Sequence, residues 1–537
     1  MPSNPFAVQQ TESMKKEFSG MLCNFYIVAL TVLLPLYTRG TYVLLGDSKY
    51  DLFRNVSLLC LGLAIVVRMA GWLIQTVNMR WIKSVAFNMM DVCMLCYGGC
   101  AVISALCSSY GTVAWTGYHE WYMGAVSQLI FVGIYFFVSR EYRGSAWPIY
   151  LWEMAFFLVI VMGFCSRIGY DPLGLLEGFN SGDWEYSHLI STIGNINWFC
   201  GYCTVALAMP VAGYLKGKNL IKKRILFVIS VLGLLLLSVQ GSDVGPVLMA
   251  ACLFVCLLWS RRDAECFRRV LLLVSGVAFG LPVYNGMVTF FGETAYKAQP
   301  ADGPGLHVFG WNGWWLVGLA CLGLYLIVGR LIRTESTGQP SVADTDRNAD
   351  VTNREAIVNG LWLGMVILAF ISALAVGAWY LSGLFGSDGW ISGRGALWRL
   401  SWKGFLRGDW KQKLLGAGPD CFAEYIYSTF APAELPVLEG YWAEAVFVNA
   451  HNQWLNHLVN TGLLGFICAA GIYITALKRY RRHLSGILTL VMYGVNSLVS
   501  FQQVMSTPLF FLMLGISEYC LRREKRRGQE KEIKGEI

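Results

Sequence analysis

Apolar runs of about twenty residues recur from one end of the chain to the other, and charged residues are concentrated between them. An α-helix needs about 20 residues to cross the hydrocarbon core of a bilayer, where backbone polar groups find no water to bond. We therefore predict an all-α fold, a polytopic membrane helix bundle with about 14 transmembrane helices. The predicted spans are residues 20–38, 53–75, 83–107, 119–138, 147–166, 190–214, 224–240, 243–260, 267–288, 311–331, 356–382, 452–477, 484–502 and 504–521.

The connections between these spans alternate between basic ones and ones poor in Lys and Arg. With the N-terminus inside, the inner connections contain basic clusters within 216–224, 261–269 and 478–482, and the C-terminal tail contains another within 522–527. An alternate connection instead carries acidic residues such as Asp171. Cytoplasmic loops of membrane proteins carry an excess of Lys and Arg. The pattern therefore predicts an even number of spans, with both termini in the cytoplasm.

Two hydrophilic insertions divide the predicted bundle. Residues 334–355 are polar and lack aromatic residues, which is typical of a flexible linker, here on the cytoplasmic side. Residues 383–450 are rich in aromatic residues, Gly and charge, so we expect one large, folded extracytoplasmic loop that carries function. The predicted domains are an N-terminal membrane bundle of about ten helices at 1–333, the linker 334–355, a C-terminal membrane part at 356–522 that includes the loop, and a cytoplasmic tail at 523–537.

The composition is that of a membrane protein. Only 14% of the 537 residues are charged and 55% are hydrophobic, whereas soluble domains carry about 25% charge. Basic cytoplasmic loops account for the net charge of +8, so we expect no nucleic-acid partner. Most of the 16 Cys lie inside apolar runs, where packing is the expected role rather than a disulfide framework, a metal site or a cofactor. The sequence contains no P-loop, GxSxG or HExxH motif of a soluble enzyme.

Charge is divided unevenly within the large loop. Residues 390–413 are basic, and apolar residues recur at near-helical spacing among them, which predicts an amphipathic helix. Such a helix can lie on anionic lipid headgroups, clamp a phosphate through arginine, or present a solvated face, and the pattern leaves these alternatives open. Residues 414–450 have no Lys or Arg, but they contain the acidic residues Asp420, Glu424, Glu434, Glu439 and Glu444.

His451 lies where the chain re-enters the membrane after the large loop. We predict that Asn449 is the N-cap of the next helix, which places His451 in the first helical turn. A helix N-terminus disfavours imidazolium, so a neutral His451 can act as a general base. The alternative is an interfacial histidine that only forms hydrogen bonds. Glu424, Glu439 and Glu444 are rival bases, because a partly buried carboxylate can also take a proton.

Other polar residues stand at the starts of predicted spans or within them. Asn452 begins a polar stripe at four-residue spacing, which favours hydrogen bonding between helices. Asn195 and Asn197 begin the sixth span, where they either cap the helix or contact a polar ligand. Arg68 and Asp91 lie at matching depths in adjacent spans, which predicts an ion pair in the inner leaflet.

Four stretches, in this order, resemble the O-antigen ligase and polymerase superfamily of bacterial membrane glycosyltransferases. They are STIGNINWFCGYCTVALAMPVAGYL (191–215), SVQGSDVGPVLMAACLFVCLLWS (238–260), SGRGALWRLSWKGF (392–405) with LLGAGPDCF (414–422), and AHNQWLNHLVNTGLLGF (450–466). The first is similar to the family's Gly-Asn-Pro-Asn helix start. The last is similar to its His-Asn helix start with a trailing Gly-Leu-Leu-Gly.

The resemblance implies a GT-C type glycosyltransferase in the bacterial plasma membrane, acting in cell-surface polysaccharide biosynthesis. It implies a donor glycan on undecaprenyl pyrophosphate in the outer leaflet, and transfer to an acceptor hydroxyl on a glycan, lipid or protein, with inversion and without a metal or cofactor. Arg394 stands at the family's loop arginine, and His451 stands at its essential histidine. Asp243 stands near a position where the family has arginine. Two alternatives follow: Arg399 or Lys403 supplies the cation, or the donor differs from that of the family. The residues expected to bind substrate are Arg399, Lys403, Asn452, Asn195 and Asn197.

A lipid-linked oligosaccharide transporter, similar to a flippase, is the alternative function, because such proteins also have about 14 spans. Transporters are commonly built from internal repeats around a site at the membrane midplane. The two halves of this chain show no repeat, and its polar features gather at the predicted outer face. We therefore expect an enzyme.

Overall fold

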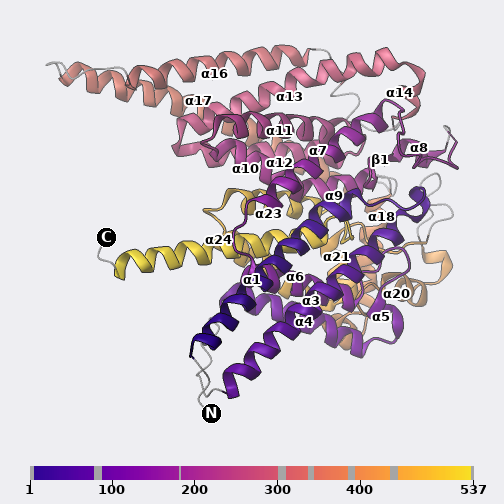
Figure 1. The fold of residues 1–537 in the computed structure, drawn as a ribbon. Coiled ribbons are helices and arrows are strands. Elements are labelled where there is room, and N and C mark those ends of the chain that lie inside the picture. Colours follow the sequence, from indigo (N-terminus) through magenta and orange to yellow (C-terminus); the bar gives the residue numbers. More distant parts are fainter. Residues whose placement is uncertain are drawn as a thin grey trace. The chain divides into compact units, whose positions relative to one another are not determined.

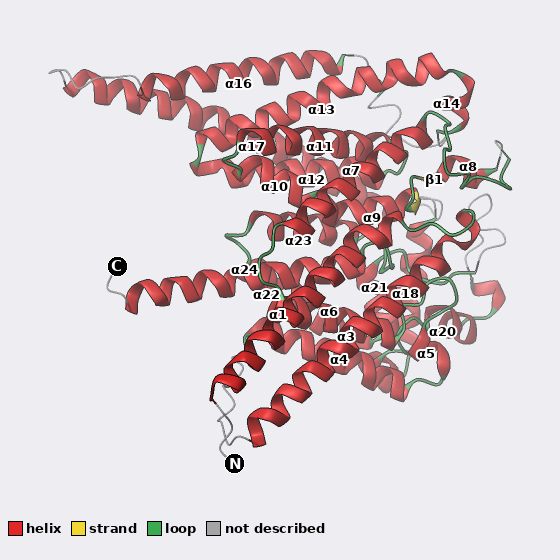
Figure 2. Ribbon diagram, in the orientation of Figure 1, coloured by secondary structure: helices red, strands yellow, loops and turns green. Residues whose placement is uncertain are grey.

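The computed structural model describes residues 5–77, 87–180, 183–299, 310–311, 313–336, 344–384, 393–435 and 446–533. This described part consists of helices and their connections, with one short ribbon in which β1 (Leu189–Ile190) pairs antiparallel with β2 (Gly194–Asn195) (Figure 2). The predicted all-α membrane fold is therefore confirmed in its class.

Ten helices among the described residues are long and apolar enough to cross a membrane, and each overlaps a predicted span. They are Ser13–Leu36, Tyr42–Ala70, Met89–Cys107, Trp147–Arg167, Ile196–Lys216, Val244–Arg262, Ala264–Phe291, Trp314–Ile332, Arg354–Ala375 and Gly462–Arg479. The chain is thus a multi-pass membrane protein. The other four predicted spans correspond to helices that are shorter or carry more charge, so the total of fourteen stays a prediction. These helices are α6 (Ala125–Glu141), α11 (Leu220–Val239), α23 (Leu484–Asn496) and α24 (Thr507–Ile533).

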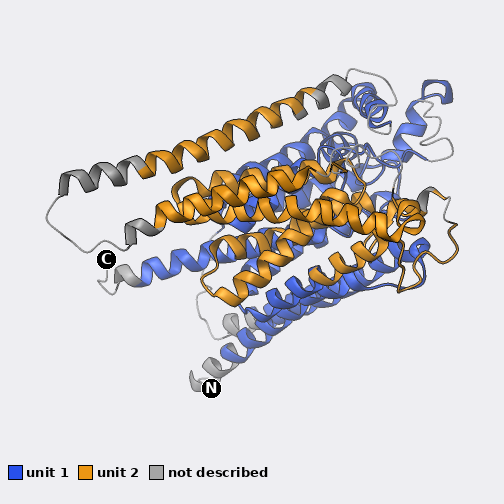
Figure 3. Cartoon of the chain, turned by 90° about the horizontal axis from the view of Figure 1, so that it is seen from above, with its two compact units in different colours: residues 1–156, 388–537 blue, residues 157–387 orange. Residues whose placement is uncertain are grey.

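The chain folds into two compact units (Figure 3). Unit 1 joins Met1–Phe156 to Asp388–Ile537, and unit 2 is Phe157–Ser387. Besides α6, α23 and α24, unit 1 contains α1 (Pro5–Val28), α2 (Leu34–Leu36), α3 (Leu45–Val77), α4 (Met89–Cys107), α5 (Thr112–Thr116), α18 (Arg394–Arg407), α19 (Trp410–Leu415), α20 (Phe422–Thr429), α21 (Gln453–Asn460) and α22 (Gly462–Arg479). It also contains a π-helix at Ala29–Leu33 and 3-10 turns at Tyr42–Leu44 and Pro432–Glu434.

Helix α7 (Trp147–Arg167) crosses from unit 1 into unit 2. Besides α11 and the ribbon, unit 2 contains α8 (Trp184–His188), α9 (Ile196–Ala206), α10 (Ala208–Lys216), α12 (Val244–Trp259), a 3-10 turn at Ser260–Arg262, α13 (Ala264–Phe291), α14 (Glu293–Lys297), α16 (Trp314–Ser336) and α17 (Asp344–Leu384). Helix α13 packs along α16 (Figure 1). Because α17 begins at Asp344, the second half of the segment predicted as a flexible linker is helical, continuous with the following span. Residues 337–343 lie outside the described part.

Unit 1 joins helices from opposite ends of the chain. Helix α4 packs against α22, and α6 packs against α24. Glycines permit the close approach: a Cβ built on Gly515 of α24 would lie 2.9 Å from the Cβ of Val138 on α6. Small residues at such crossings favour helix packing in membranes. This pairing packs the helices that follow residue 393 against the N-terminal helices of unit 1.

A buried charge network connects α4, α6, α22 and α24. Its two carboxylates, Asp91 and Glu518, are fully buried. Asp91 Oδ2 lies 3.0 Å from Arg140 and 2.8 Å from Arg522. Glu518 accepts from Arg479 at 2.6 Å and from Arg522 at 2.7 Å. Each buried carboxylate is thus compensated by arginines from two helices, as a charge in low dielectric requires.

The predicted ion pair between Arg68 and Asp91 is wrong. Arg68 is half exposed and pairs with Glu141 at 2.6 Å. Helix α4 begins at Met89 with Asn88 as its N-cap, so Asp91 lies in the first turn, where its side chain accepts from the Asn88 backbone at 3.0 Å. The predicted depth of Asp91 assumed a helix that begins several residues earlier.

Removing one member of the network should destabilise unit 1. We expect Glu518→Gln to lower the free energy of unfolding by about 3–5 kcal/mol, because two arginines lose their buried counter-charge. The matched control is Arg68→Ala, which breaks an exposed pair and should cost about 0–1 kcal/mol. Denaturant unfolding of the detergent-solubilised protein measures both. Equal stability of the two variants would contradict the network's structural role.

Candidate functional site

The described parts of the large loop are folded around a hydrophobic core. Helix α18 packs against α20 and α21, and side chains from α4 and α5 close the same core. The buried members from the loop are Ala396, Leu397, Leu400, Ala417, Cys421, Phe422, Tyr425, Ile426, Phe430, Phe447 and Ala450. These residues are therefore folded, whereas one large loop spanning 383–450 remains a prediction. Its extracytoplasmic location remains a prediction, and the rival bases Glu439 and Glu444 lie outside the described residues.

Main-chain hydrogen bonds attach the loop to the end of α21. The N–H groups of Ala417 and Gly418 donate to the carbonyls of Val459 and Asn460, both at 2.9 Å. Gly416 has φ of +78°, and a Cβ there would lie 2.3 Å from the carbonyl carbon of Asn460, so only glycine fits without displacement. These contacts fix the position of the following residues, including Asp420, relative to α21.

Arg394 is the first residue of α18, and its side chain is 8% exposed. The predicted helix in the basic part of the loop is therefore confirmed. Arg399 is half-buried and Lys403 is exposed on the same helix. Of the apolar residues at near-helical spacing, Leu397 and Leu400 are buried, whereas Trp402 and Leu406 are exposed.

His451 lies just before α21 and not in its first turn. The N-cap is Asn452, so the predicted cap at Asn449 is wrong. His451 has φ of +46°, and its N–H donates to Asn449 Oδ1 at 2.9 Å. Burial, with the nearby positive charge of Arg394, lowers the pKa of His451 well below its usual value. The imidazole is thus neutral, as predicted, but desolvation is the larger cause and not the helix dipole.

The asparagine stripe of α21 forms hydrogen bonds to backbone groups. Asn452 Oδ1 accepts from the N–H groups of Trp454 and Leu455, and Asn452 Nδ2 donates to the carbonyl of Leu498 at 2.9 Å. Asn456 Oδ1 accepts from the Ala450 N–H at 2.7 Å. These bonds favour the predicted role in hydrogen bonding over substrate contact by Asn452.

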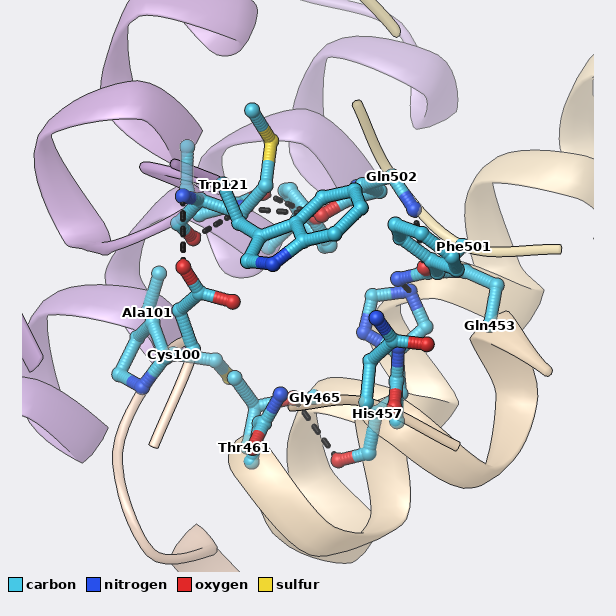
Figure 4. A pocket seen from close by; sticks show the side chains of 17 residues that line it. Cys100, Ala101, Trp121, Gln453, His457, Thr461, Gly465, Phe501 and Gln502 are labelled. Atoms are coloured by element: carbon cyan, nitrogen blue, oxygen red, sulfur yellow. Dashed lines mark hydrogen bonds between the residues drawn. The ribbon is translucent and has the colours of Figure 1, made fainter. Parts of the chain in front are cut away.

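A polar pocket lies beside His451 in unit 1. Trp121 stands on one side of its free space, and His457 and Thr461 stand on the other (Figure 4). The free volume is about 30 Å³, enough for one or two water-sized groups. The other polar residues that line it are Asp420, Asn449, Gln453, Asn456, Asn460 and Gln502. Among the described residues, no Lys or Arg lines this space.

The floor of the pocket is a closed ring of hydrogen bonds. Tyr97 donates to Gln128 at 2.6 Å, Gln128 donates to Gln502 at 2.9 Å, and Gln502 donates back to Tyr97 at 3.0 Å. Gln453 Oε1 accepts from the backbone N–H of Gln502 at 2.7 Å. These bonds fix the side chains of Gln128, Gln453 and Gln502, so their amide groups keep a defined orientation.

Asp420 is a site residue that the sequence analysis did not single out. Its Oδ2 accepts from the backbone N–H groups of Tyr118 and Met123, both at 2.8 Å. Burial, and to a lesser degree the charge of Glu424, raise the pKa of Asp420 to about 7. Burial also raises the pKa of Glu424, which is half-buried on α20. Both carboxyl groups therefore remain chemically eligible to take a proton near neutral pH.

Backbone strain is concentrated around this pocket. Glu120, Tyr122, Asp420 and His451 have φ between +46° and +73°, a region that residues other than glycine rarely adopt. They are all of the described non-glycine residues of unit 1 with positive φ. Trp121 lies between two of them. Strain of this kind gathers at functional sites, where the surrounding fold maintains it.

Aromatic contacts link the pocket to His451. Trp121 meets Phe501 edge to face at 4.8 Å between ring centroids. Phe501 in turn meets the His451 ring at 5.1 Å. Phe501 therefore lies between the histidine and the tryptophan and contacts both rings.

The predicted residues of the sixth span belong to unit 2. Asn195 is the N-cap of α9 and accepts from the Asn197 N–H at 2.8 Å. Asn197 Oδ1 accepts from Ser242 at 2.7 Å, which ties this helix start to the turn before α12. Asp243 is the residue before α12. These contacts support the capping alternative for Asn195.

Within the described ranges, no three His, Cys, Asp or Glu side chains are grouped as they would be around a metal ion. No protein-family model matches the chain, and no characterised protein matches its sequence.

Proposed function

We propose that this protein is a glycosyltransferase that moves a glycan from undecaprenyl pyrophosphate to an acceptor hydroxyl, similar to O-antigen ligases and polymerases. The observation that carries the proposal is the placement of His451. It is a buried, neutral imidazole that feels the charge of Arg394 and lies on strained backbone. It contacts Phe501 and Asn449, two residues that line the polar pocket. A base, a cation and a hydroxyl-binding space are the components that this reaction needs.

The reaction is a single displacement at the anomeric carbon. The acceptor oxygen forms a bond to C1 of the donor sugar, and the bond from C1 to the pyrophosphate oxygen breaks. Its electron pair leaves with the pyrophosphate, and the anomeric configuration inverts. Pyrophosphate is a good leaving group when its charge is compensated, and the Arg394 guanidinium can do so with two parallel hydrogen bonds. Arg399 and Lys403 extend the positive charge along α18.

His451 takes the proton that the acceptor hydroxyl loses. A neutral imidazole is the form that accepts a proton, and burial favours that form. Arg394 disfavours the imidazolium further, so the base remains available until the donor pyrophosphate offsets the arginine charge. Binding of the donor thus prepares His451 to receive the proton.

The direct test uses the purified protein in liposomes with a lipid pyrophosphate-linked glycan and a hydroxyl-bearing acceptor. We expect a covalently extended acceptor that forms in the presence of a metal chelator. A transporter of lipid-linked oligosaccharides would move the donor across the bilayer and form no such product. The absence of any product with an authentic donor and acceptor pair would refute the proposal.

The proposal requires the large loop on the outer face of the bacterial plasma membrane, with both termini in the cytoplasm. We expect a membrane-impermeant maleimide to label Lys411→Cys on intact spheroplasts, in a variant whose native cysteines have been replaced. Lys525→Cys, in the C-terminal tail, should be labelled only after the membrane is opened. Both positions are exposed. The reverse labelling pattern would place the site on the wrong side for this donor.

A further inference from the structure

The charge of the pocket around Asp420, hereafter the Asp420 pocket, restricts what it can bind. A carboxyl group and several amides line it, and among the described residues no Lys or Arg does. An anionic group would therefore meet no counter-charge, and above about pH 7, where Asp420 is ionised, it would also be repelled by that carboxylate. The occupant is accordingly not the donor pyrophosphate. It is a neutral group that both donates and accepts hydrogen bonds.

We infer that the Asp420 pocket is an acceptor subsite, which binds a hydroxyl-bearing arm of a neutral sugar and rejects acidic sugars. This inference rests on the proposed function, because it identifies the acceptor class of that reaction.

The size of the pocket decides which part of a sugar enters. A free volume of about 30 Å³ holds one or two oxygen atoms with their carbon but not a pyranose ring. The ring must then remain outside this free volume. Trp121, which lines the free space, is half-buried, and aromatic side chains suit the apolar C–H surface of a sugar ring.

The hydrogen-bonding groups match a hydroxyl. The two backbone N–H groups that bind Asp420 both donate to Oδ2, and Oδ1 is the atom that can accept from a ligand hydroxyl. Side-chain amides provide N–H donors for the same hydroxyl oxygen. The two backbone N–H groups fix the carboxylate, and the positive φ of Asp420 shows that the fold holds it in a costly conformation.

Two residues that line the Asp420 pocket also contact the proposed base, His451. Asn449 lines the pocket, and its Oδ1 accepts the N–H of His451. Phe501 lines the pocket as well and contacts the imidazole ring. A sugar anchored here by one hydroxyl arm therefore keeps its other hydroxyls within the region of the proposed base, which is the purpose of an acceptor subsite.

Asp420→Asn removes the negative charge of the side chain and keeps its shape. The amide oxygen can still accept both backbone N–H groups, so the anchor persists while the negative charge is removed. Asp409→Asn is the matched control, because Asp409 is an exposed carboxylate that caps α19. Trp121→Ala removes the aromatic face and leaves the carboxylate in place.

The test is photoaffinity labelling of the full-length protein in lipid nanodiscs at pH 8.5. The probes are a diazirine-bearing methyl glucoside and the corresponding methyl glucuronoside, which differ only in one carboxylate. Labelled peptides are mapped by mass spectrometry. In the native protein and in Asp409→Asn, we expect the glucoside to label the segments around Trp121 and Asp420 at least roughly tenfold more than the glucuronoside. Asp420→Asn should reduce that preference to about twofold or less, and Trp121→Ala should reduce glucoside labelling about tenfold.

Three outcomes would overturn the inference. The first is labelling that maps elsewhere, and the second is equal labelling by both probes in the native protein. The third is an unchanged preference in Asp420→Asn, provided that this variant has the same unfolding temperature as the native protein. Because the experiment measures binding and not transfer, failure of the inference can be distinguished from failure of the proposed function. Charge-selective labelling without transfer of any glycan would remove the function and leave a neutral-sugar site. Transfer that depends on His451, with labelling independent of Asp420, would retain the function and remove the subsite.

Discussion

His451→Ala is expected to reduce glycan transfer by about 10²–10⁴-fold, because a positioned general base contributes roughly that factor. Binding of the lipid-linked donor should persist, since the donor phosphates are assigned to Arg394 and the neighbouring cations. The two effects are measured separately, by single-turnover product formation and by donor binding in nanodiscs. His483→Ala is the matched control, because that histidine contacts Ser517 at 3.2 Å at the start of α23, away from the site.

The pH dependence of transfer identifies the base. A base whose pKa is lowered by folding stays deprotonated at pH values where a free imidazole is already charged. Because the pKa of His451 lies well below 6.5, activity should persist on acidification through pH 6.5 and fall only below it. If Asp420 were the base, its pKa of about 7 would place the loss of activity near neutral pH. An acidic limb near pH 7 that Asp420→Asn removes would contradict the histidine assignment.

Arg394→Ala is expected to reduce transfer by about 10²–10³-fold, the usual cost of removing a donor aimed at developing negative charge. Arg394→Lys should recover only part of this loss, since an ammonium cannot form the two parallel hydrogen bonds of a guanidinium. The effect is measured as kcat and KM for the lipid-linked donor.

The control for Arg394 lies on the same helix. Arg407 is exposed, pairs with Glu434, and stacks over the Phe430 ring at 4.3 Å. Arg407→Lys keeps the positive charge of α18 and should leave transfer within about twofold of the native rate. Normal transfer by Arg394→Ala would eliminate the proposed role of this arginine.

The membrane fold was predictable from the sequence because its signal is local. Runs of apolar residues specify spanning helices without reference to the rest of the chain. The helix that begins at Arg394 was predictable for the same reason, since its spacing is visible within 390–413. The exposed Trp402 was not, because the side of α18 that is covered depends on α20 and α21, which follow later in the sequence.

The candidate site was predictable only in the residues that stand inside a motif. Arg394 and His451 were identified through the resemblance. Asp420 and Trp121 are about 300 positions apart in the chain, and contacts such as the backbone bonds from Tyr118 and Met123 to Asp420 join their segments. The N-cap was misplaced by three residues because Asn449 and Asn452 are equally good caps in isolation. The structure selects Asn452, whose side chain also reaches Leu498.

The anchoring of Asp420 has a consequence for how this site can evolve. Its two donors are peptide N–H groups, so replacing the side chain of Tyr118 or Met123 leaves both donors in place. Among the natural amino acids, only proline lacks that N–H. The side chains of Tyr118 and Met123 can therefore vary while the carboxylate keeps its position. The neighbouring Gly117 and Gly124 cannot, because their Cβ atoms would meet backbone atoms within 2.5 Å. If the Asp420 pocket is the acceptor subsite proposed above, single substitutions at Tyr118 or Met123 can change the sugar preference without loss of the anchor.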